Sequence, residues 1–409
     1  MMLKYETVTC PDSLNCLASS TWGIVYQERN VFMKTIDGGN TWFNVFMDKG
    51  YAVYDEDSVW QYWKFPPTVR SIDCPTNNLC IAVHDSGYVS RTTDGGYTWN
   101  RNAITNIALR EIDMYDSLNG IVSNVAAGAF LTKDGGVTWN KVEFPDSMNT
   151  TGIWLQSYTD SNTIILSTYP KDGRNCIIRS EDRGKTWVKR QTTTEITSFM
   201  GMKFVNKQKG WTVGRRKTGE TGGQSIYNDC IYYTSNGGDT WGISLDSMTY
   251  PSGLTVIDAF DENHIMASGP HSQVWMSVDG GKNWHRQNDL HDMGKYGGII
   301  DLAFISKTSA IALNSWEDEI YKYTEGPVDV NDRTNIIFDS DFNIFPNPAT
   351  DYIHINSSPK ELFTNIEIFS TLGVKMIEAI NSDEIDVSEL PSGIYFLKHK
   401  SQFYKFVKL

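Results

Sequence analysis

One eight-residue motif, Ser/Thr-x-Asp-x-Gly-x-Thr-Trp, recurs six times along this chain and constrains its fold more than any other feature. Asn replaces the Asp in the fifth copy and the Thr in the sixth. The paired Asp and Trp positions are Asp37 and Trp42, Asp94 and Trp99, Asp134 and Trp139, Asp182 and Trp187, Asn236 and Trp241, and Asp279 and Trp284. Each copy follows a β-rich run, and its glycines adopt positive φ without steric cost. Each copy therefore predicts the corner of a β-hairpin.

The residues of the motif have architectural roles. An Asp at the start of a tight turn accepts hydrogen bonds from backbone N–H groups two or three residues ahead, and the flanking Ser or Thr hydroxyl satisfies another. The Trp re-enters a strand and is expected to bury its ring. Successive Trp residues are 40 to 57 residues apart, a period that suits a four-stranded propeller blade. The chain is therefore predicted to be all-β, with these side chains in a structural role.

These motifs resemble the Asp-box, or bacterial neuraminidase repeat, of β-propellers in sialidases, xyloglucanase-type glycosidases, sortilin-like receptors and photosystem II assembly factors. The resemblance implies a seven-bladed β-propeller over residues 1–325. A seventh blade is suggested by the runs at 299–304, 310–314 and 319–324, which lack a box and a clear outer strand. The related families perform unrelated tasks on this scaffold, so the resemblance implies a fold and leaves the function open.

The last 70 or so residues have a different character. Phe345-Pro-Asn-Pro348 is followed by the apolar run 366–370, by Leu390-Pro-Ser-Gly393 and by a terminal Phe406-Val-Lys-Leu409. In order and spacing this segment is similar to the C-terminal sorting domain of Bacteroidetes type IX secretion. The resemblance implies a small Ig-like β-sandwich at 342–409 after a linker at 326–341. It also implies engagement with the type IX machinery and a secreted or cell-surface location.

Four of the six cysteines form a repeated pattern, Cys10 with Cys16 and Cys74 with Cys80, on the two arms of the first hairpin of two blades. Cysteines that face each other on antiparallel strands come within disulfide range. Closing so short a loop would stabilise each blade by about 2 to 3 kcal/mol. We therefore predict two disulfides and an oxidising setting, with pairs of buried free thiols as the alternative.

The charge and the N-terminal sequence bear on partners and export. The chain has 36 Lys and Arg against 49 Asp and Glu, a net charge of −13, which argues against nucleic acid or an anionic membrane surface as a partner. No apolar run has the length of a membrane span. No signal peptide is visible at the start, although export is predicted. We therefore expect the native chain to begin upstream of Met1.

An Ile-Asp pair recurs near the start of four blades, giving Asp73, Asp113, Asp258 and Asp301. These residues are expected on the innermost strands, next to the central channel. Two interpretations are open. The carboxylates form an acidic throat for a cation, or each one is a repeat feature that is hydrogen-bonded to the next blade. The second interpretation is the one we favour.

Two insertions depart from the repeat. Residues 43–68 carry Tyr54, Trp60 and Trp63 among several carboxylates and form either a packed flap or an exposed aromatic platform. Sugar rings stack on aromatic faces and carboxylates accept their hydroxyls, so we predict a binding surface there, on the face opposite the Asp-boxes. The second insertion, 213–230, contains Arg215-Arg216-Lys217 and lacks phosphate-loop spacing. A solvated loop is expected there.

No catalytic constellation is evident, and we predict no catalytic residues, no metal ligands and no cofactor. The early Arg-Ile-Pro element of sialidases is absent, as is the N-terminal Asp motif of xyloglucanases. The seven His residues contain no His-Glu-x-x-His and no Cys/His cluster of ligand spacing. The sequence therefore favours a binding module for a protein or carbohydrate ligand. The alternative is a glycan-acting hydrolase that uses the face opposite the Asp-boxes.

Overall fold

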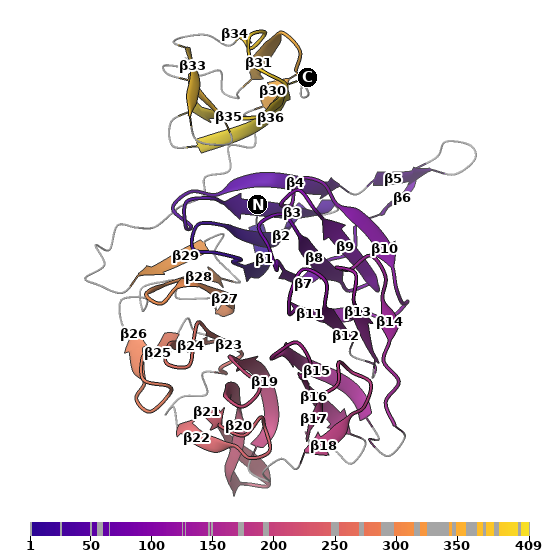
Figure 1. Ribbon diagram of the computed structural model, residues 1–409, viewed down its shortest axis with the longest axis vertical. Helices are drawn as coiled ribbons and strands as arrows, with labels where there is room; N and C mark the ends of the chain where they lie inside the picture. The colour runs from indigo at the N-terminus through magenta and orange to yellow at the C-terminus, as the bar shows by residue number, and fades with distance from the viewer. Residues whose placement is uncertain are drawn as a thin grey trace.

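The computed structural model describes residues 2–24, 27–49, 51–54, 60–64, 66–124, 126, 128–145, 148, 150–170, 176–190, 196–246, 253–269, 274–287, 298–314, 320–324, 343–345, 349–356, 366–370, 374–379, 384–399 and 402–408. Successive antiparallel sheets surround a central axis, and a small β domain follows them (Figure 1). The prediction of an all-β propeller with a C-terminal β domain is confirmed. The predicted linker, 326–341, lies outside the described residues.

The first three blades are four-stranded antiparallel sheets with their strands in sequence order. They consist of β1 (Met2–Thr9), β2 (Cys16–Ile24), β3 (Gln27–Thr35) and β4 (Phe43–Lys49); β7 (Val69–Asp73), β8 (Cys80–His84), β9 (Tyr88–Thr92) and β10 (Asn100–Ala103); and β11 (Leu109–Met114), β12 (Gly120–Asn124), β13 (Gly128–Thr132) and β14 (Asn140–Lys141). A separate two-stranded ladder, β5 (Tyr51–Tyr54) and β6 (Trp60–Lys64), is inserted between the first two blades.

The remaining blades repeat this plan. They consist of β15 (Thr150–Tyr158), β16 (Ile164–Pro170), β17 (Cys176–Ser180) and β18 (Val188–Arg190); β19 (Ile196–Phe204), β20 (Gly210–Thr221), β21 (Gln224–Thr234) and β22 (Gly242–Leu245); β23 (Val256–Ala259), β24 (Ile265–Ser268), β25 (Val274–Ser277) and β26 (His285–Gln287); and β27 (Ile299–Ser306), β28 (Ser309–Asn314) and β29 (Ile320–Thr324). In its described residues the seventh blade has three strands, in line with the outer strand missing from the sequence pattern.

Apolar side chains pack between blades, because both faces of each sheet are covered by neighbours. A separate cluster of buried residues fills each of the seven gaps between adjacent blades. Each Asp-box Trp enters the gap shared with the preceding blade. Trp99 of blade two, for example, stacks on Phe32 of blade one with 4.5 Å between ring centroids. The box Trp therefore joins two blades, which the repeat pattern alone did not reveal.

Blades seven and one complete the ring through side chains. Tyr5 and Met33 of blade one share a buried cluster with Ile311 and Leu313 of blade seven. The two blades also meet at their inner strands, β27 and β1, beside the central axis. Apolar burial of this kind contributes most of the stabilisation available to an interface between sheets.

The C-terminal domain contains two antiparallel sheets. One consists of β30 (Asn343–Phe345), β31 (Tyr352–Asn356) and β34 (Glu384–Asp386), and the other of β33 (Lys375–Ala379), β32 (Ile366–Ser370), β35 (Gly393–His399) and β36 (Gln402–Lys408). Ile353, Ile368, Leu397 and Phe406 are among the residues of a core that the two sheets enclose. This core is separate from the clusters of the propeller, so the domain has its own hydrophobic centre.

Candidate functional site

The Asp-box turn uses both oxygens of its carboxylate. Asp94 accepts hydrogen bonds from the N–H of Thr98 at 2.9 Å and of Tyr97 at 3.0 Å, and from the Thr92 hydroxyl at 2.7 Å. Its second oxygen accepts from the Thr98 hydroxyl at 2.6 Å. Gly96, at φ 96°, adopts the left-handed conformation that the turn requires. A carboxylate with this many donors is committed to the turn.

These donors lower the pKa values of the box aspartates. The Thr186 hydroxyl, followed by the Thr186 N–H, holds the pKa of Asp182 at about 2. The N–H of Asn283, followed by its side-chain amide, holds the pKa of Asp279 at about 2. Hydrogen bonds to the ionised form favour that form. In the fifth box Asn236 keeps the turn, accepting from the N–H of Thr240 at 3.0 Å.

The box turns are also held from two sides, as the second one illustrates. The N–H of Gly95 donates to the carbonyl of Asn78 in the first hairpin of its own blade, at 2.9 Å. Lys34 of the preceding blade donates to the carbonyl of Gly95 at 3.2 Å, although the lysine is only 8% exposed. Arg91 repeats this contact one blade on, at 2.7 Å from the carbonyl of Gly135. Both cations lie three residues before the Asp of their own box. That spacing could have indicated the contact with the next blade, but the sequence analysis did not identify it.

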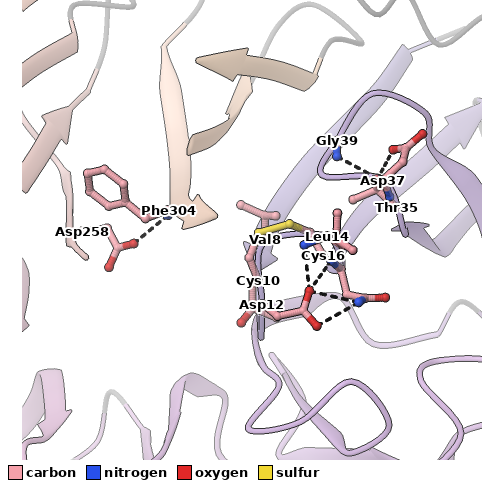
Figure 2. The surroundings of a disulfide bond; sticks show 12 residues. Val8, Cys10, Asp12, Leu14, Cys16, Thr35, Asp37, Gly39, Asp258 and Phe304 are labelled. Atoms are coloured by element: carbon pink, nitrogen blue, oxygen red, sulfur yellow. Dashed lines mark hydrogen bonds between the residues drawn. A yellow bond between two sulfur atoms is a disulfide. The ribbon is translucent and has the colours of Figure 1, made fainter. Parts of the chain in front are cut away.

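The first hairpins carry the disulfides. Cys10 and Cys16 are bonded, with 4.1 Å between Cα atoms, as are Cys74 and Cys80. The Asp12 carboxylate accepts from the N–H of Leu14 inside the first of these loops (Figure 2). Related caps recur in the first hairpins of later blades, for instance at Asp116, Asp160 and Asp261. Cys176 and Cys230 are buried and belong to neither of these disulfides.

The inner strands of all seven blades surround a central cavity of about 490 Å³. Asp73 accepts a hydrogen bond from the N–H of Met114 at 2.6 Å, in the next blade. The equivalent bonds join Asp113 to the N–H of Tyr158, Asp258 to the N–H of Phe304 at 3.0 Å and Asp301 to the N–H of Val8 at 2.9 Å. The preferred interpretation of the Ile-Asp pairs, a bond from each Asp to the next blade, is confirmed. The last bond also links blade seven to blade one.

Two further charged residues line this cavity. Glu111 lies two residues before Asp113 on the same strand and accepts from the N–H of Gln156 in the next blade. Lys203 is the equivalent in blade five of Asp113 in blade three. Each is the second-last residue of the innermost strand that pairs with the second strand of its blade. The Lys203 ammonium lies 3.0 Å from the Asp258 carboxylate. The cavity thus contains five carboxylates and one ammonium within the described residues.

Burial raises the pKa values of the cavity carboxylates. It raises the pKa of Glu111 to about 7 and the pKa of Asp301 to about 6. The pKa of both Asp73 and Asp113 is also raised by burial, and the charge of Asp113 adds to the rise at Asp73. Asp258 beside Lys203 holds the pKa of the ammonium above its usual value. Desolvation disfavours a charge unless an opposite charge lies close to it.

The aromatic insertion forms the β5–β6 hairpin. It begins at the end of β4, and β4 itself starts directly after the first Asp-box, so the hairpin lies on the face opposite the boxes. Figure 1 shows the ladder projecting outward from the propeller beside β4. Tyr54 stands opposite Trp60 in the ladder, and Ala52 stands opposite Trp63. Directly opposed positions share a face of a ladder, so Tyr54 and Trp60 share one, and a register irregularity lies between that pair and the pair of Ala52 and Trp63.

The side chains of these three aromatics lie outside the described part of the structure. Side-chain hydrogen bonds hold the base of the insertion at Pro67. The carbonyl of Pro67 accepts from the Asn30 amide at 2.8 Å and from Nδ1 of His84 at 2.9 Å. The other ring nitrogen of His84 accepts from the Ser90 hydroxyl at 2.8 Å. Blades one and two thus both hold the segment where it rejoins the propeller.

The expectation of a loop in blade five is wrong, although much of the segment is solvent-exposed as expected. Residues 213–230 extend the second and third strands of that blade into a long paired arm, with Arg216 opposite Asn228. Arg215 pairs with Asp229 at 3.3 Å, and Arg216 pairs with Asp246 at 2.7 Å. Lys217 pairs with Glu220. Continued strand pairing and these ion pairs account for the order, and the cations are therefore not a free anion site.

In the part of the chain that the structure describes, no three His, Cys, Asp or Glu side chains converge as a metal site requires. No helix in that part of the chain has the length and apolar character to span a bilayer.

Comparison with known proteins agrees with this architecture. Residues 343–408 match the secretion system C-terminal sorting domain family, and residues 127–252 match the sortilin, neurotensin receptor 3 family. Vacuolar protein sorting/targeting protein 10 of Lodderomyces elongisporus is 29% identical over 137 residues, which are 32% of this chain and 8% of that protein. The chain therefore corresponds to a small part of that relative.

Solved propellers share the fold. A structure of YCF48 bound to D1 peptide has a TM-score of 0.54 at 16% identity and covers 79% of this chain and 92% of its own. The GH74 xyloglucanase of Xanthomonas campestris has a TM-score of 0.54 at 13% identity and covers 78% and 51%. The sorting domain implies secretion or cell-surface attachment and engagement with the type IX machinery. The chain thus combines a β-propeller that is similar to the sortilin family over residues 127–252 and to YCF48 in fold with a C-terminal domain that matches the type IX secretion sorting domain family.

Proposed function

We propose that this exported propeller is a non-catalytic binding module whose ligand contacts the β5–β6 hairpin through Tyr54, Trp60 and Trp63. The observation that carries the proposal is a two-stranded hairpin that belongs to no blade and in which Tyr54 stands directly opposite Trp60, with Trp63 on the same strand as Trp60. Aromatic rings present large flat surfaces at a low cost in conformational entropy, which suits the stacking of sugar rings. A carbohydrate is the ligand class that this composition favours, with a protein as the alternative.

The attachment of the hairpin supports this role. Asn30 is 2% exposed, and His84 is fully buried, so the bonds from both to the carbonyl of Pro67 lie in the packed interior. Burial lowers the pKa of His84, which keeps its ring neutral and able to accept from Ser90 while it donates to Pro67. A fixed base reduces the ordering cost of a binding element.

The carboxylates of the propeller support binding over hydrolysis. A glycosidase needs two carboxyl groups that are free to exchange protons with a substrate across a cleft. The box aspartates are engaged by turn donors, and the cavity carboxylates accept backbone N–H groups from neighbouring blades. These bonds give both sets a structural task within the described residues.

The proposal is tested with the full chain on an array of defined oligosaccharides. We expect the parent protein to bind a subset of glycans and the Trp60→Ala/Trp63→Ala variant to lose at least tenfold in affinity. Tyr227→Ala is the matched control, because Tyr227 is an aromatic that is 46% exposed on the blade-five arm. Its affinity is expected to equal that of the parent.

Three outcomes would overturn parts of the proposal. If the double variant binds the same glycans with parental affinity, the hairpin is not the contact surface. Release of shorter sugars from the bound glycans, followed by mass spectrometry, would indicate the hydrolase instead. Failure of every glycan to bind would reject the carbohydrate assignment and favour a protein ligand.

A further inference from the structure

The outward face of one sorting-domain sheet carries an aromatic residue that is buried for no reason internal to that domain. In β35, Tyr395 and Leu397 belong to the domain core, so the intervening Phe396 points to the other side of the sheet. That side is charged: Glu367 stands opposite Lys398 in the ladder, and their side chains are 3.5 Å apart. Phe396 is nevertheless only 6% exposed. Something outside the domain core covers it.

The covering residue is Phe43 of blade one. Its ring centroid lies 5.4 Å from that of Phe396, with the planes inclined at 66°. This edge-to-face arrangement is a favoured geometry for aromatic pairs. Phe43 is 7% exposed and belongs to neither of the buried clusters that flank blade one. Each phenylalanine therefore lies outside the core of its own domain, is buried, and contacts the other.

The contact joins two sheet edges. Phe43 opens β4, the outermost strand of blade one, and β36 is an edge strand of the sorting-domain sheet. The two strands lie beside each other, and Figure 1 shows the sorting domain next to β4. Phe369 stands opposite Phe396 in the sorting-domain ladder and widens the apolar patch on that face. Sheet edges that stay uncovered are templates for pairing with other chains.

We propose that Phe43 and Phe396 form an intramolecular latch that holds the sorting domain against the edge of blade one. While the latch is closed, the propeller occupies the outward face of the β33-β32-β35-β36 sheet, and β4 and β36 are shielded from other chains. A partner that binds this face of the sorting domain must compete with blade one. The occupant of the face is thus a defined segment of this chain.

Small-angle X-ray scattering of the full chain tests the latch. The parent is expected to give a compact profile, whereas Phe43→Ala and Phe396→Ala give a larger maximum dimension and a broader distance distribution. Phe260→Ala is the matched control, since Phe260 is 44% exposed in blade six. Its profile is expected to equal that of the parent. Each sample is measured at several concentrations to separate domain opening from association.

Cross-linking gives a second readout that does not depend on loss of the compact form. A Phe43→Cys/Phe396→Cys chain treated with a short bismaleimide should yield an intramolecular product that joins peptides of β4 and β35. The control chain Phe260→Cys/Phe396→Cys, which places one thiol in blade six instead, should yield several times less. The latch is rejected if the parent is already as extended as Phe43→Ala, or if the cross-link joins separate chains, which would assign the contact to a second copy.

Discussion

Aspartate holds the propeller together at its Asp-box turns and at its central cavity, and the two locations shift its pKa in opposite directions. Hydrogen-bond donors hold the pKa of Asp182 and Asp279 at about 2 in the turns. Burial raises the pKa of Asp301 to about 6 in the cavity. The turn surrounds a partly exposed carboxylate with several hydrogen-bond donors, whereas the cavity buries each carboxylate near other carboxylates. The repeat therefore places aspartates in two environments, one that lowers the pKa of the carboxyl group and one that raises it.

Two kinds of contact connect neighbouring blades. At the box turns the Trp of one blade packs against the preceding blade, and a cation of the preceding blade binds the turn, as Trp99 and Lys34 do. At the cavity the contact consists of carboxylates that accept backbone N–H groups of the next blade, as at Asp73 and Asp258. The first kind depends on apolar burial, and the second depends on the protonation of acidic groups.

The largest expected loss of stability follows from removing Trp99, which packs between blades one and two. Trp99→Ala removes a ring that stacks on Phe32 between two blades, and we expect a loss of about 3 to 5 kcal/mol in the free energy of unfolding. Chemical denaturation with far-ultraviolet circular dichroism measures it. Tyr88→Ala, at a more exposed aromatic of the same blade, is the control and should lose less than about 1 kcal/mol. A Trp99→Ala chain as stable as the parent would show that Trp99 does not stabilise the contact between the two blades.

The pH profile of stability should show both regimes. The folded pKa values of Glu111 and Asp301 lie above their unfolded values, so the folded chain takes up protons between pH 8 and pH 5 that the unfolded chain does not. The free energy of unfolding is therefore expected to rise by about 1 to 3 kcal/mol as the pH falls across that window. Lys203, which faces these carboxylates, stays charged throughout and limits the rise.

Below about pH 4 the box turns should reverse that trend. The folded pKa values of Asp182 and Asp279 lie below their unfolded values, so the stability they contribute is lost as the pH falls toward 2. Denaturation midpoints at unit steps of pH test the whole curve. Stability that increases steadily from pH 5 to pH 8 would contradict the raised pKa values in the cavity.

The charge of the box carboxylate can be tested separately from its hydrogen bonds, because Asn already replaces the Asp in one box. Asp94→Ala leaves the N–H groups of Tyr97 and Thr98 without an acceptor and should cost about 1 to 3 kcal/mol. Asp94→Asn keeps one acceptor oxygen, as Asn236 does in blade five, and should cost less than about 1 kcal/mol. Thermal unfolding of both variants decides the point. Equal losses would show that the turn requires the charge as well as the acceptor.

The smallest effect is expected at a strained turn residue. Arg183 has φ 63° at the position where the other boxes have glycine. A left-handed conformation is costly for a side chain with a Cβ, so Arg183→Gly should stabilise the protein by about 0.5 to 1 kcal/mol. Gly95→Ala is the opposite control, because a Cβ there would lie 2.8 Å from the carbonyl oxygen of Asn77. Differential scanning calorimetry measures both, and a destabilised Arg183→Gly chain would contradict the strain argument.

Much of this fold was predictable from local sequence. The Asp-box motifs fix six turns, because turn geometry depends on residues within one short segment, as at Asp94 and Gly96. The Ile-Asp pairs placed four carboxylates on inner strands because the repeat aligns them. The cysteine spacing predicted loops that the disulfides close. The order of motifs likewise placed the sorting domain at the C-terminal end.

Only the tertiary structure decided which neighbouring blade or domain each residue contacts. The sequence did not reveal that Trp99 packs against blade one, that Lys34 reaches the turn of blade two, or that Lys203 takes a position equivalent to Asp113. It also gave no reason to connect Phe43 with Phe396, which are far apart in the chain and adjacent in space. Local sequence determines turns and strands because those depend on backbone dihedral preferences and side-chain alternation. Contacts between blades and domains depend on register and burial, which are set only when the sheets pack.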